Sequence, residues 1–179
     1  MKILLTILIC SLLKDIKGQS VIYRGEKSYP ATNEWQFEIK SSIPEGFPQD
    51  ILKVTVAKIS QTTGYLMLTV AIHSYKDYID GLVLLYLDNG KVITIQKRSA
   101  GDKVDWESSA LFILNSTQIN LLKGSKILKI RYNIYGDLDT GSHTASNFGK
   151  NNDSYNEAQE RALYKTDNEI AELFSEEDQ

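Results

Sequence analysis

The sequence predicts a mainly β protein: an antiparallel, β-sandwich-like domain of about seven strands, followed by a C-terminal α-helix. Apolar residues recur at every second position through most of residues 34–135, and turn-forming residues separate these runs. After residue 153 the apolar spacing changes to that of a helix. The alternative is an α+β arrangement, in which the C-terminal helix covers one face of a single curved sheet. The chain's 179 residues suit one domain of either kind.

The strands are predicted from alternation. In residues 34–40, Trp35, Phe37 and Ile39 share one face while charged and amide side chains share the other, which indicates a half-buried strand. Residues 51–59 form the next apolar run. Residues 65–74 carry apolar side chains on both faces, so this strand is expected to be central and covered on both sides.

A β-hairpin is predicted over residues 82–95, where two apolar runs flank Asn89-Gly90. Asn-Gly suits both positive φ angles of a two-residue type I′ turn. That turn would place Asp88 opposite Lys91 and Tyr86 opposite Ile93.

Two more strands with a short helix between them follow. Residues 103–114 are predicted as one strand, with Trp106 in phase with Phe112. A helix then begins at Asn115 or Ser116 and ends at Gly124 in the left-handed conformation. Residues 127–135 alternate again and give the last predicted strand.

Residues 136–153 are nearly all turn formers and predict a polar loop. Ser154 and Glu157 form a capping-box pattern, and an amphipathic helix is expected from there to about residue 174. Ile170 and Leu173 lie on its apolar stripe. The sandwich and the single curved sheet therefore differ in how deeply these two side chains are buried.

The first eighteen residues resemble a secretory signal, with Lys2 ahead of an apolar run over residues 3–13. The run is too short to span a bilayer as a helix, and cleavage is expected after Gly18. Ile9 before Cys10 argues against lipid attachment at that cysteine. The predicted divisions are a signal peptide (1–18), one β-rich domain with its 136–150 polar loop (19–150), and an acidic amphipathic helix and tail (151–179).

Composition narrows the function classes. One cysteine and two histidines cannot supply a structural zinc site or a disulfide framework. The formal net charge of −3 does not favour a nucleic-acid partner. Acidity gathers in residues 151–179, where nine acidic residues stand against Arg161 and Lys165. This acidic helix is a candidate for binding a protein partner or a second copy. We expect a secreted or periplasmic protein of a bacterial envelope, with no stable membrane span once the signal is cleaved.

Common catalytic motifs are missing from the sequence: there is no G-x-S-x-G elbow, phosphate-binding loop or H-E-x-x-H helix. An enzymatic role is therefore not favoured, and no catalytic residue, cofactor or metal is predicted. Of the two histidines, His73 ends a predicted strand and is expected to be structural, whereas His143 lies in the polar loop.

Asp137, Asp139 and His143 make the polar loop one candidate ligand-binding segment. Alternate acidic residues near a glycine partly resemble a calcium loop, but Gly141 stands where the third oxygen ligand is needed. The alternatives are an ordinary linker, or a small hydrolase site that uses the acid pair or His143.

Tyr75 and Tyr78 make a second candidate, a polar and aromatic connection between two strong strands. It can form a small binding surface at one end of the sheet, or simply a solvated loop. The sequence thus favours a non-enzymatic binding or assembly module, with a secreted hydrolase or a ligand- or calcium-binding protein as the alternative.

Overall fold

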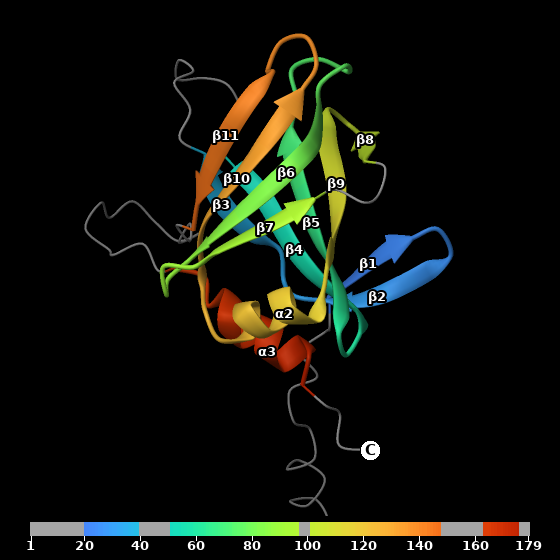
Figure 1. Ribbon diagram of the computed structural model, residues 1–179. Helices are drawn as coiled ribbons and strands as arrows, with labels where there is room; N and C mark the ends of the chain where they lie inside the picture. Colours follow the sequence, from blue (N-terminus) through green and yellow to red (C-terminus); the bar gives the residue numbers. More distant parts are fainter. Residues whose placement is uncertain (1–19, 40–50, 97–100, 148–162, 176–179) are drawn as a thin grey trace, which may run out of the picture.

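The computed structural model describes residues 20–39, 51–96, 101–147 and 163–175, and over these the chain forms one antiparallel sheet and two short helices (Figure 1). The mainly β prediction is confirmed, with eleven strands in the described residues rather than about seven. The strands are β1 (Ser20–Arg24), β2 (Lys27–Ala31), β3 (Trp35–Ile39), β4 (Ile51–Ser60), β5 (Thr63–Ala71), β6 (Tyr78–Leu87), β7 (Val92–Gln96), β8 (Asp102–Val104), β9 (Glu107–Leu114), β10 (Ile127–Tyr135) and β11 (Gly141–Ser146); the helices are α2 (Ser116–Lys123) and α3 (Thr166–Leu173).

The sheet follows the order β7-β6-β10-β11-β3-β4-β5-β9-β8 and curves until its two ends approach each other. β6 and β7 at one end contact β9 near the other. There the backbone N–H of Ile79 on β6 donates to the Ser108 hydroxyl on β9, at 3.2 Å. The alternative architecture, a single curved sheet, therefore describes the molecule.

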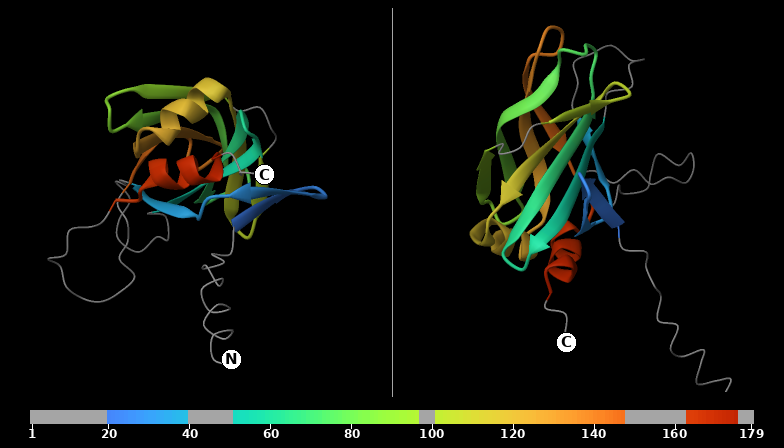
Figure 2. Two further views of the ribbon diagram at one scale, coloured as in Figure 1. Left: turned by 90° about the horizontal axis from the view of Figure 1, so that it is seen from below. Right: turned by 90° about the vertical axis from the view of Figure 1, so that its right-hand side faces the viewer.

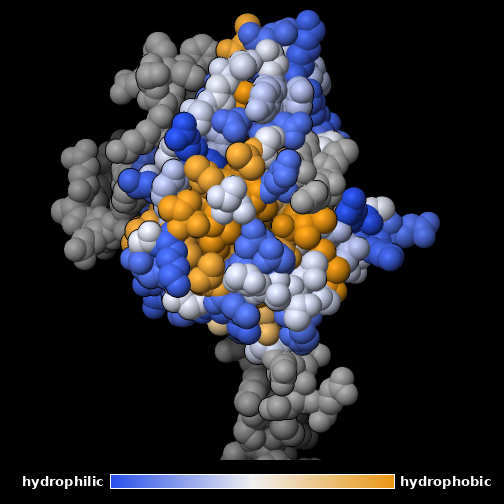
Figure 3. Space-filling view, viewed as in Figure 1, coloured by the Kyte–Doolittle hydropathy of each residue, from blue (hydrophilic) through white to orange (hydrophobic). Residues whose placement is uncertain are grey.

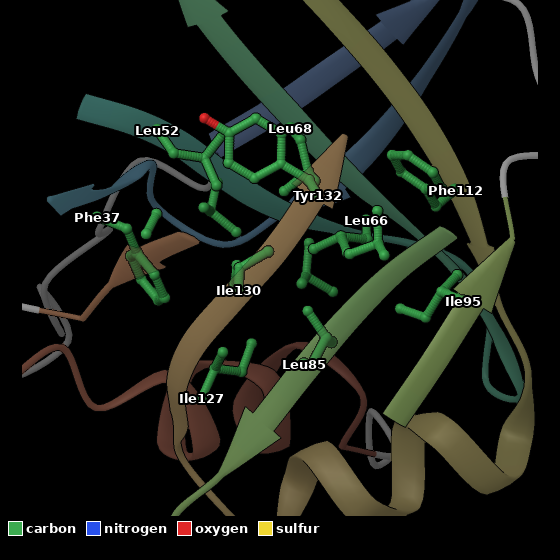
Figure 4. Packing of buried hydrophobic residues seen from close by; sticks show 14 of the residues in the cluster. Phe37, Leu52, Leu66, Leu68, Leu85, Ile95, Phe112, Ile127, Ile130 and Tyr132 are labelled. Carbon is green, nitrogen blue, oxygen red and sulfur yellow. The ribbon is translucent and has the colours of Figure 1, made fainter. Parts of the chain in front are cut away.

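The core lies inside this curve (Figure 4). Alternation sends every second side chain inward, so that Phe37, Leu52 and Leu66 on one wall point toward Leu85 and Ile130 on the other. All five are fully buried. The two walls are thereby held together mainly by apolar burial.

The two helices lie side by side at one end of the curved sheet (Figure 2). Ile170, Leu173 and Phe174 are buried in the main core, so the apolar side of α3 is covered within the same chain. Glu169 on this helix accepts a hydrogen bond from the indole Nε1 of Trp35 at 3.0 Å. The helix is thus attached to the sheet by both apolar and polar contacts.

The β1–β2 hairpin lies off the main strand order, on the outside of the sheet. Its Ile22 packs in a second apolar cluster with Ala57 of β4 and Tyr65 of β5. This cluster covers the outer face of β5, which confirms the prediction that the strand is covered on both sides. A separate group of apolar side chains is exposed over β6, β7 and β9 (Figure 3), where Leu82, Val92 and Ile113 are only partly covered.

The β6–β7 hairpin forms at the predicted place but with a different register. Tyr86 pairs with Val92, not Ile93, and the backbone N–H of Leu87 donates to Lys91 O. The connection therefore has three residues, with Gly90 at φ 80°. A one-residue slip exchanges the faces of a strand, and the observed register turns Ile93 inward, where it is buried. Burial outweighs the preference of Asn-Gly for the tighter turn.

The predicted polar loop contains a strand, β11, over six of its residues. β11 pairs with β10 along Lys129 to Ile134 and with β3 at Ile39 and Glu38. The sequence Gly-Ser-His-Thr-Ala-Ser has a weak intrinsic strand preference. The strand forms because backbone hydrogen bonds to two neighbouring strands stabilise it, although its residue pattern does not predict a strand.

Several helix boundaries also differ from the prediction. The C-terminal helix begins at Thr166, and residues 163–165 are not helical. Asn115 does cap α2, in a capping box with Gln118, but Gly124 has φ −112° and is not left-handed. The predicted signal peptide and the capping box at Ser154 lie outside the described residues. Among the residues described, no helix has the length and apolar character needed to cross a membrane.

Candidate functional site

Three connections meet at the end of the sheet opposite the helices: residues 72–77, the turn at 105–106, and residues 136–140 (Figure 1). Ile72 donates its backbone N–H to Trp106 O at 2.8 Å, which joins the first connection to the second. Loops at one end of a rigid sheet are where binding residues are commonly placed.

Asp77 joins the first connection to the third. Its side chain is fully buried, and Oδ1 accepts hydrogen bonds from the backbone N–H groups of Asp137 at 2.8 Å and Leu138 at 3.2 Å. Oδ2 accepts from Ser74 N at 3.1 Å. A buried carboxylate needs such partners to offset its lost hydration. Asp77 therefore orders two loops that are distant in sequence.

Gly136 allows this close approach. A Cβ at this position would lie 2.2 Å from Asp77 Oδ1 and 2.5 Å from Asp77 Cα, and its φ is 153°. Both the space and the backbone angle favour glycine over any other residue. The junction of the two loops therefore depends on this residue pair.

Trp106 and Tyr75 form an exposed ring pair on these connections. Their ring centroids are 4.2 Å apart and their planes are tilted by 49°. Trp106 remains 50% exposed and Tyr75 58% exposed. Large aromatic side chains left this accessible at a fixed place are typical of recognition surfaces.

The turn that carries Trp106 is strained. Val104 pairs with Glu107, so Asp105 and Trp106 form a two-residue connection, with φ angles of 48° and 65°. Glycine, asparagine or aspartate normally occupies such positions, whereas a bulky L residue such as Trp106 in the left-handed region costs about 1–2 kcal/mol. The predicted continuous strand over 103–114 is therefore wrong at this turn, because Asp-Trp carries no strong turn signal.

Lys103 connects this ring pair to a second one. Its ammonium Nζ donates to the backbone oxygen of Tyr75 and lies 5.2 Å from the centroid of the Tyr78 ring, within the range of a cation–π contact. The Tyr78 ring in turn stacks on Tyr135, with centroids 6.1 Å apart and planes at 30°. We call the four rings of Tyr75, Trp106, Tyr78 and Tyr135 the aromatic surface.

The structure thus brings Tyr75 and Tyr78 into one surface, and it gives the two acids of the polar loop different partners. The Asp137 carboxylate pairs with Lys76 Nζ at 2.8 Å. Asp139 instead faces His143, with 3.6 Å between Oδ1 and Nε2.

His143 lies on the inner side of β11, stacked on Tyr132 with centroids 5.6 Å apart. Ser142 precedes it and faces the other way, where its hydroxyl accepts a 2.7 Å hydrogen bond from Arg131 Nε. Adjacent residues of a strand point to opposite faces, so Ser142 is not placed for activation by His143. In the described part of the chain, no three or more His, Cys, Asp or Glu side chains form a metal-binding group.

Tyr132, whose ring stacks on this histidine, is fully buried. Burial raises the pKa of its phenol well above the ordinary value, and the negative charge of Asp139 raises it further. The hydroxyl has no hydrogen-bond partner. The phenol therefore stays neutral at ordinary pH and serves as part of the core.

Sequence reasoning found two of the four rings and missed Trp106, Tyr135 and the linking Lys103. Trp106 was assigned to a strand interior, and Tyr135 to the last position of a strand. The available signal was the position of aromatic residues beside strand ends, which becomes informative only when the strand order is known.

Comparison with known proteins gives no match: no family model, curated protein or solved structure is similar to this chain. The function is therefore argued from the geometry of the aromatic surface.

Proposed function

We propose that this protein is an exported, non-enzymatic binding module of a bacterial envelope, and that the aromatic surface holds its ligand. The observation that carries the proposal is Trp106, a half-exposed indole on a strained turn, packed against the Tyr75 ring. Trp and Tyr dominate the binding energy of many interfaces because they offer large contact area at little conformational cost.

The strain at Trp106 supports binding over a purely structural role. A turn with no task beyond reversing the chain is best served by Asn-Gly, which adopts these angles without penalty. Strained backbone that persists is found preferentially at ligand clamps and active sites. The other tryptophan, Trp35, is fully buried and has an ordinary role in the core.

Export is supported by the N-terminal sequence pattern. Lys2 precedes an apolar run of signal-peptide length, and Cys10, within that run, is the chain's single cysteine. Once the signal is removed at Gly18, the protein folds without disulfides, which suits a bacterial envelope.

The proposal is tested with the full chain and two immobilised probe sets, a random-peptide phage library and a panel of neutral polysaccharides. The wild type is compared with Trp106→Gly and Tyr75→Ala. The matched control is Tyr23→Ala, which removes an exposed ring from β1, outside the aromatic surface.

We expect at least one probe to be retained by the wild type and by Tyr23→Ala, with retention at least tenfold weaker in both aromatic-surface variants. Retention that is insensitive to Trp106 and Tyr75, or no retention of either probe set, would overturn the proposal. Intact mass of the protein from a cell-envelope fraction tests export separately, with Gln19 expected as the first residue.

A further inference from the structure

We infer that the ligand of the aromatic surface is a neutral polysaccharide chain. This inference rests on the proposed binding function and adds the chemical class of the ligand. It follows from three properties of the surface: the succession of its rings, the way each ring pair packs, and the local charge.

The four rings are linked by a series of contacts. The Trp106 ring packs against Tyr75, and the backbone oxygen of Tyr75 accepts a hydrogen bond from Lys103 Nζ. The same ammonium group lies over the Tyr78 ring, which stacks on Tyr135. Tyr135 and Tyr78 are themselves 43% and 38% exposed. A succession of accessible rings suits an extended ligand with repeated flat units.

The packing of each ring pair determines how a ligand can lie. Within a pair the rings contact each other, with centroids 4.2 Å and 6.1 Å apart, so a side chain cannot enter between them. The accessible area is on their outer sides. Pyranose rings present a flat face of C–H groups that stacks on an aromatic ring without needing a groove, and such stacking combines apolar contact with weak C–H···π attraction.

Polar groups beside the rings can form hydrogen bonds with the hydroxyl groups at the edge of a sugar ring. A Cβ on Gly81 would lie 3.1 Å from the Tyr135 hydroxyl and 3.6 Å from the Asn133 amide nitrogen, so these two groups meet over Gly81. Its φ of 77° also favours glycine. The Asp80 carboxylate lies beside this position, since its Oδ1 accepts a 2.7 Å hydrogen bond from the backbone N–H of Gly81. Hydroxyl, amide and carboxylate groups are good partners for sugar hydroxyls.

Local charge argues against a polyanion. Within two residues of the rings, or in contact with them, two basic side chains stand against four acidic ones, apart from the buried Asp77. The basic residues are Lys76 and Lys103, and the acidic residues are Asp80, Asp105, Glu107 and Asp137, of which Glu107 pairs with Lys53. Nucleic acids and acidic polysaccharides need an excess of positive charge for binding. A neutral chain meets no such barrier.

The test is native affinity electrophoresis of the full chain in gels that contain hydroxyethylcellulose, xyloglucan, galactomannan or laminarin. Polygalacturonate serves as the acidic probe. The variants are Trp106→Gly, Trp106→Phe and Tyr78→Ala, with Tyr23→Ala as the matched control, and thermal unfolding establishes that each variant folds.

We expect at least one neutral polysaccharide to retard the wild type, with affinity at least tenfold lower in Trp106→Gly and Tyr78→Ala. Trp106→Phe retains a ring and should stay within about fivefold of the wild type, as expected when the binding energy comes largely from ring stacking. If Trp106→Gly fails to fold, Tyr78→Ala decides the outcome alone.

Three results would overturn the inference: no retardation by any neutral polysaccharide, retardation that these variants do not change, or stronger binding to polygalacturonate. The peptide library separates the two proposals. If peptides bind through the rings and polysaccharides do not, the ligand class is wrong while the binding function stands. If neither binds through the rings, both proposals fail.

Discussion

Asp77 Oδ1 accepts a 2.8 Å hydrogen bond from the backbone N–H of Asp137, a residue sixty positions later in the chain. This contact joins the β5–β6 connection to the β10–β11 turn and orders the end of the sheet that carries Tyr75, Tyr78 and Tyr135. Because the carboxylate is buried and also accepts from Leu138 and Ser74, its removal should affect both stability and binding.

We predict that Asp77→Asn lowers the free energy of unfolding by about 1–3 kcal/mol, since an amide nitrogen then faces a backbone donor in a buried site. Urea unfolding measures the loss. Asp137→Asn is the matched control, because its carboxylate makes a surface pair with Lys76 and should change stability by less than about 0.5 kcal/mol. Equal effects of the two variants would contradict the role given to Asp77.

Because of the strain at Trp106, we expect glycine to be more stable than alanine at this position, the reverse of the usual order. Trp106→Gly should be more stable than Trp106→Ala by about 1 kcal/mol, because alanine at φ 65° retains the left-handed penalty and glycine does not. At Val104, in the extended strand β8, the order should reverse and alanine should be the more stable substitution. Thermal unfolding of the four variants tests this, and the same order at both positions would rule out strain at the turn.

Tyr132→Phe should stabilise the protein by about 1–2 kcal/mol near neutral pH, because it removes a buried hydroxyl that has no hydrogen-bond partner. Urea unfolding at pH 7 measures this gain. A destabilised variant would mean that the hydroxyl has a partner after all.

The same substitution should change the response to alkaline pH. Burial raises the pKa of folded Tyr132 above its ordinary value of 10.0, so above about pH 10 the unfolded chain loses this proton while the folded protein keeps it. Stability of the wild type should therefore fall as the pH rises beyond that point. Unfolding curves from pH 8 to pH 11 should show a smaller fall for Tyr132→Phe, and parallel curves would contradict the prediction.

Glu169 anchors α3 to the sheet through Trp35 and Asn33. Glu169→Ala should lower the free energy of unfolding by about 1–3 kcal/mol, because it leaves the buried indole N–H without an acceptor. Glu169→Gln keeps a carbonyl oxygen there and should lose less. Exposed Glu172 on the same helix is the control, and its alanine variant should lie within about 0.5 kcal/mol of the wild type. Unfolding followed by tryptophan fluorescence checks all three.

The sequence by itself determined the main strands and the mainly β class. Trp35, Phe37 and Ile39 alternate so regularly that burial of one face dictates both the strand and the face, and the cap candidates Asn115 and Ser116 marked where the short helix begins. These features are local, because a period of two or a capping box is contained within a few residues.

Only the tertiary structure decided the rest, because the deciding interactions join distant residues. β11 is a strand because β10 and β3 supply its partners, and the β6–β7 register slipped by one residue because Ile93 is better placed in the core. Trp106 lies in a turn rather than in the predicted strand, and there its ring packs against Tyr75, thirty-one residues earlier. The aromatic surface exists only where the folded sheet brings four strand ends together.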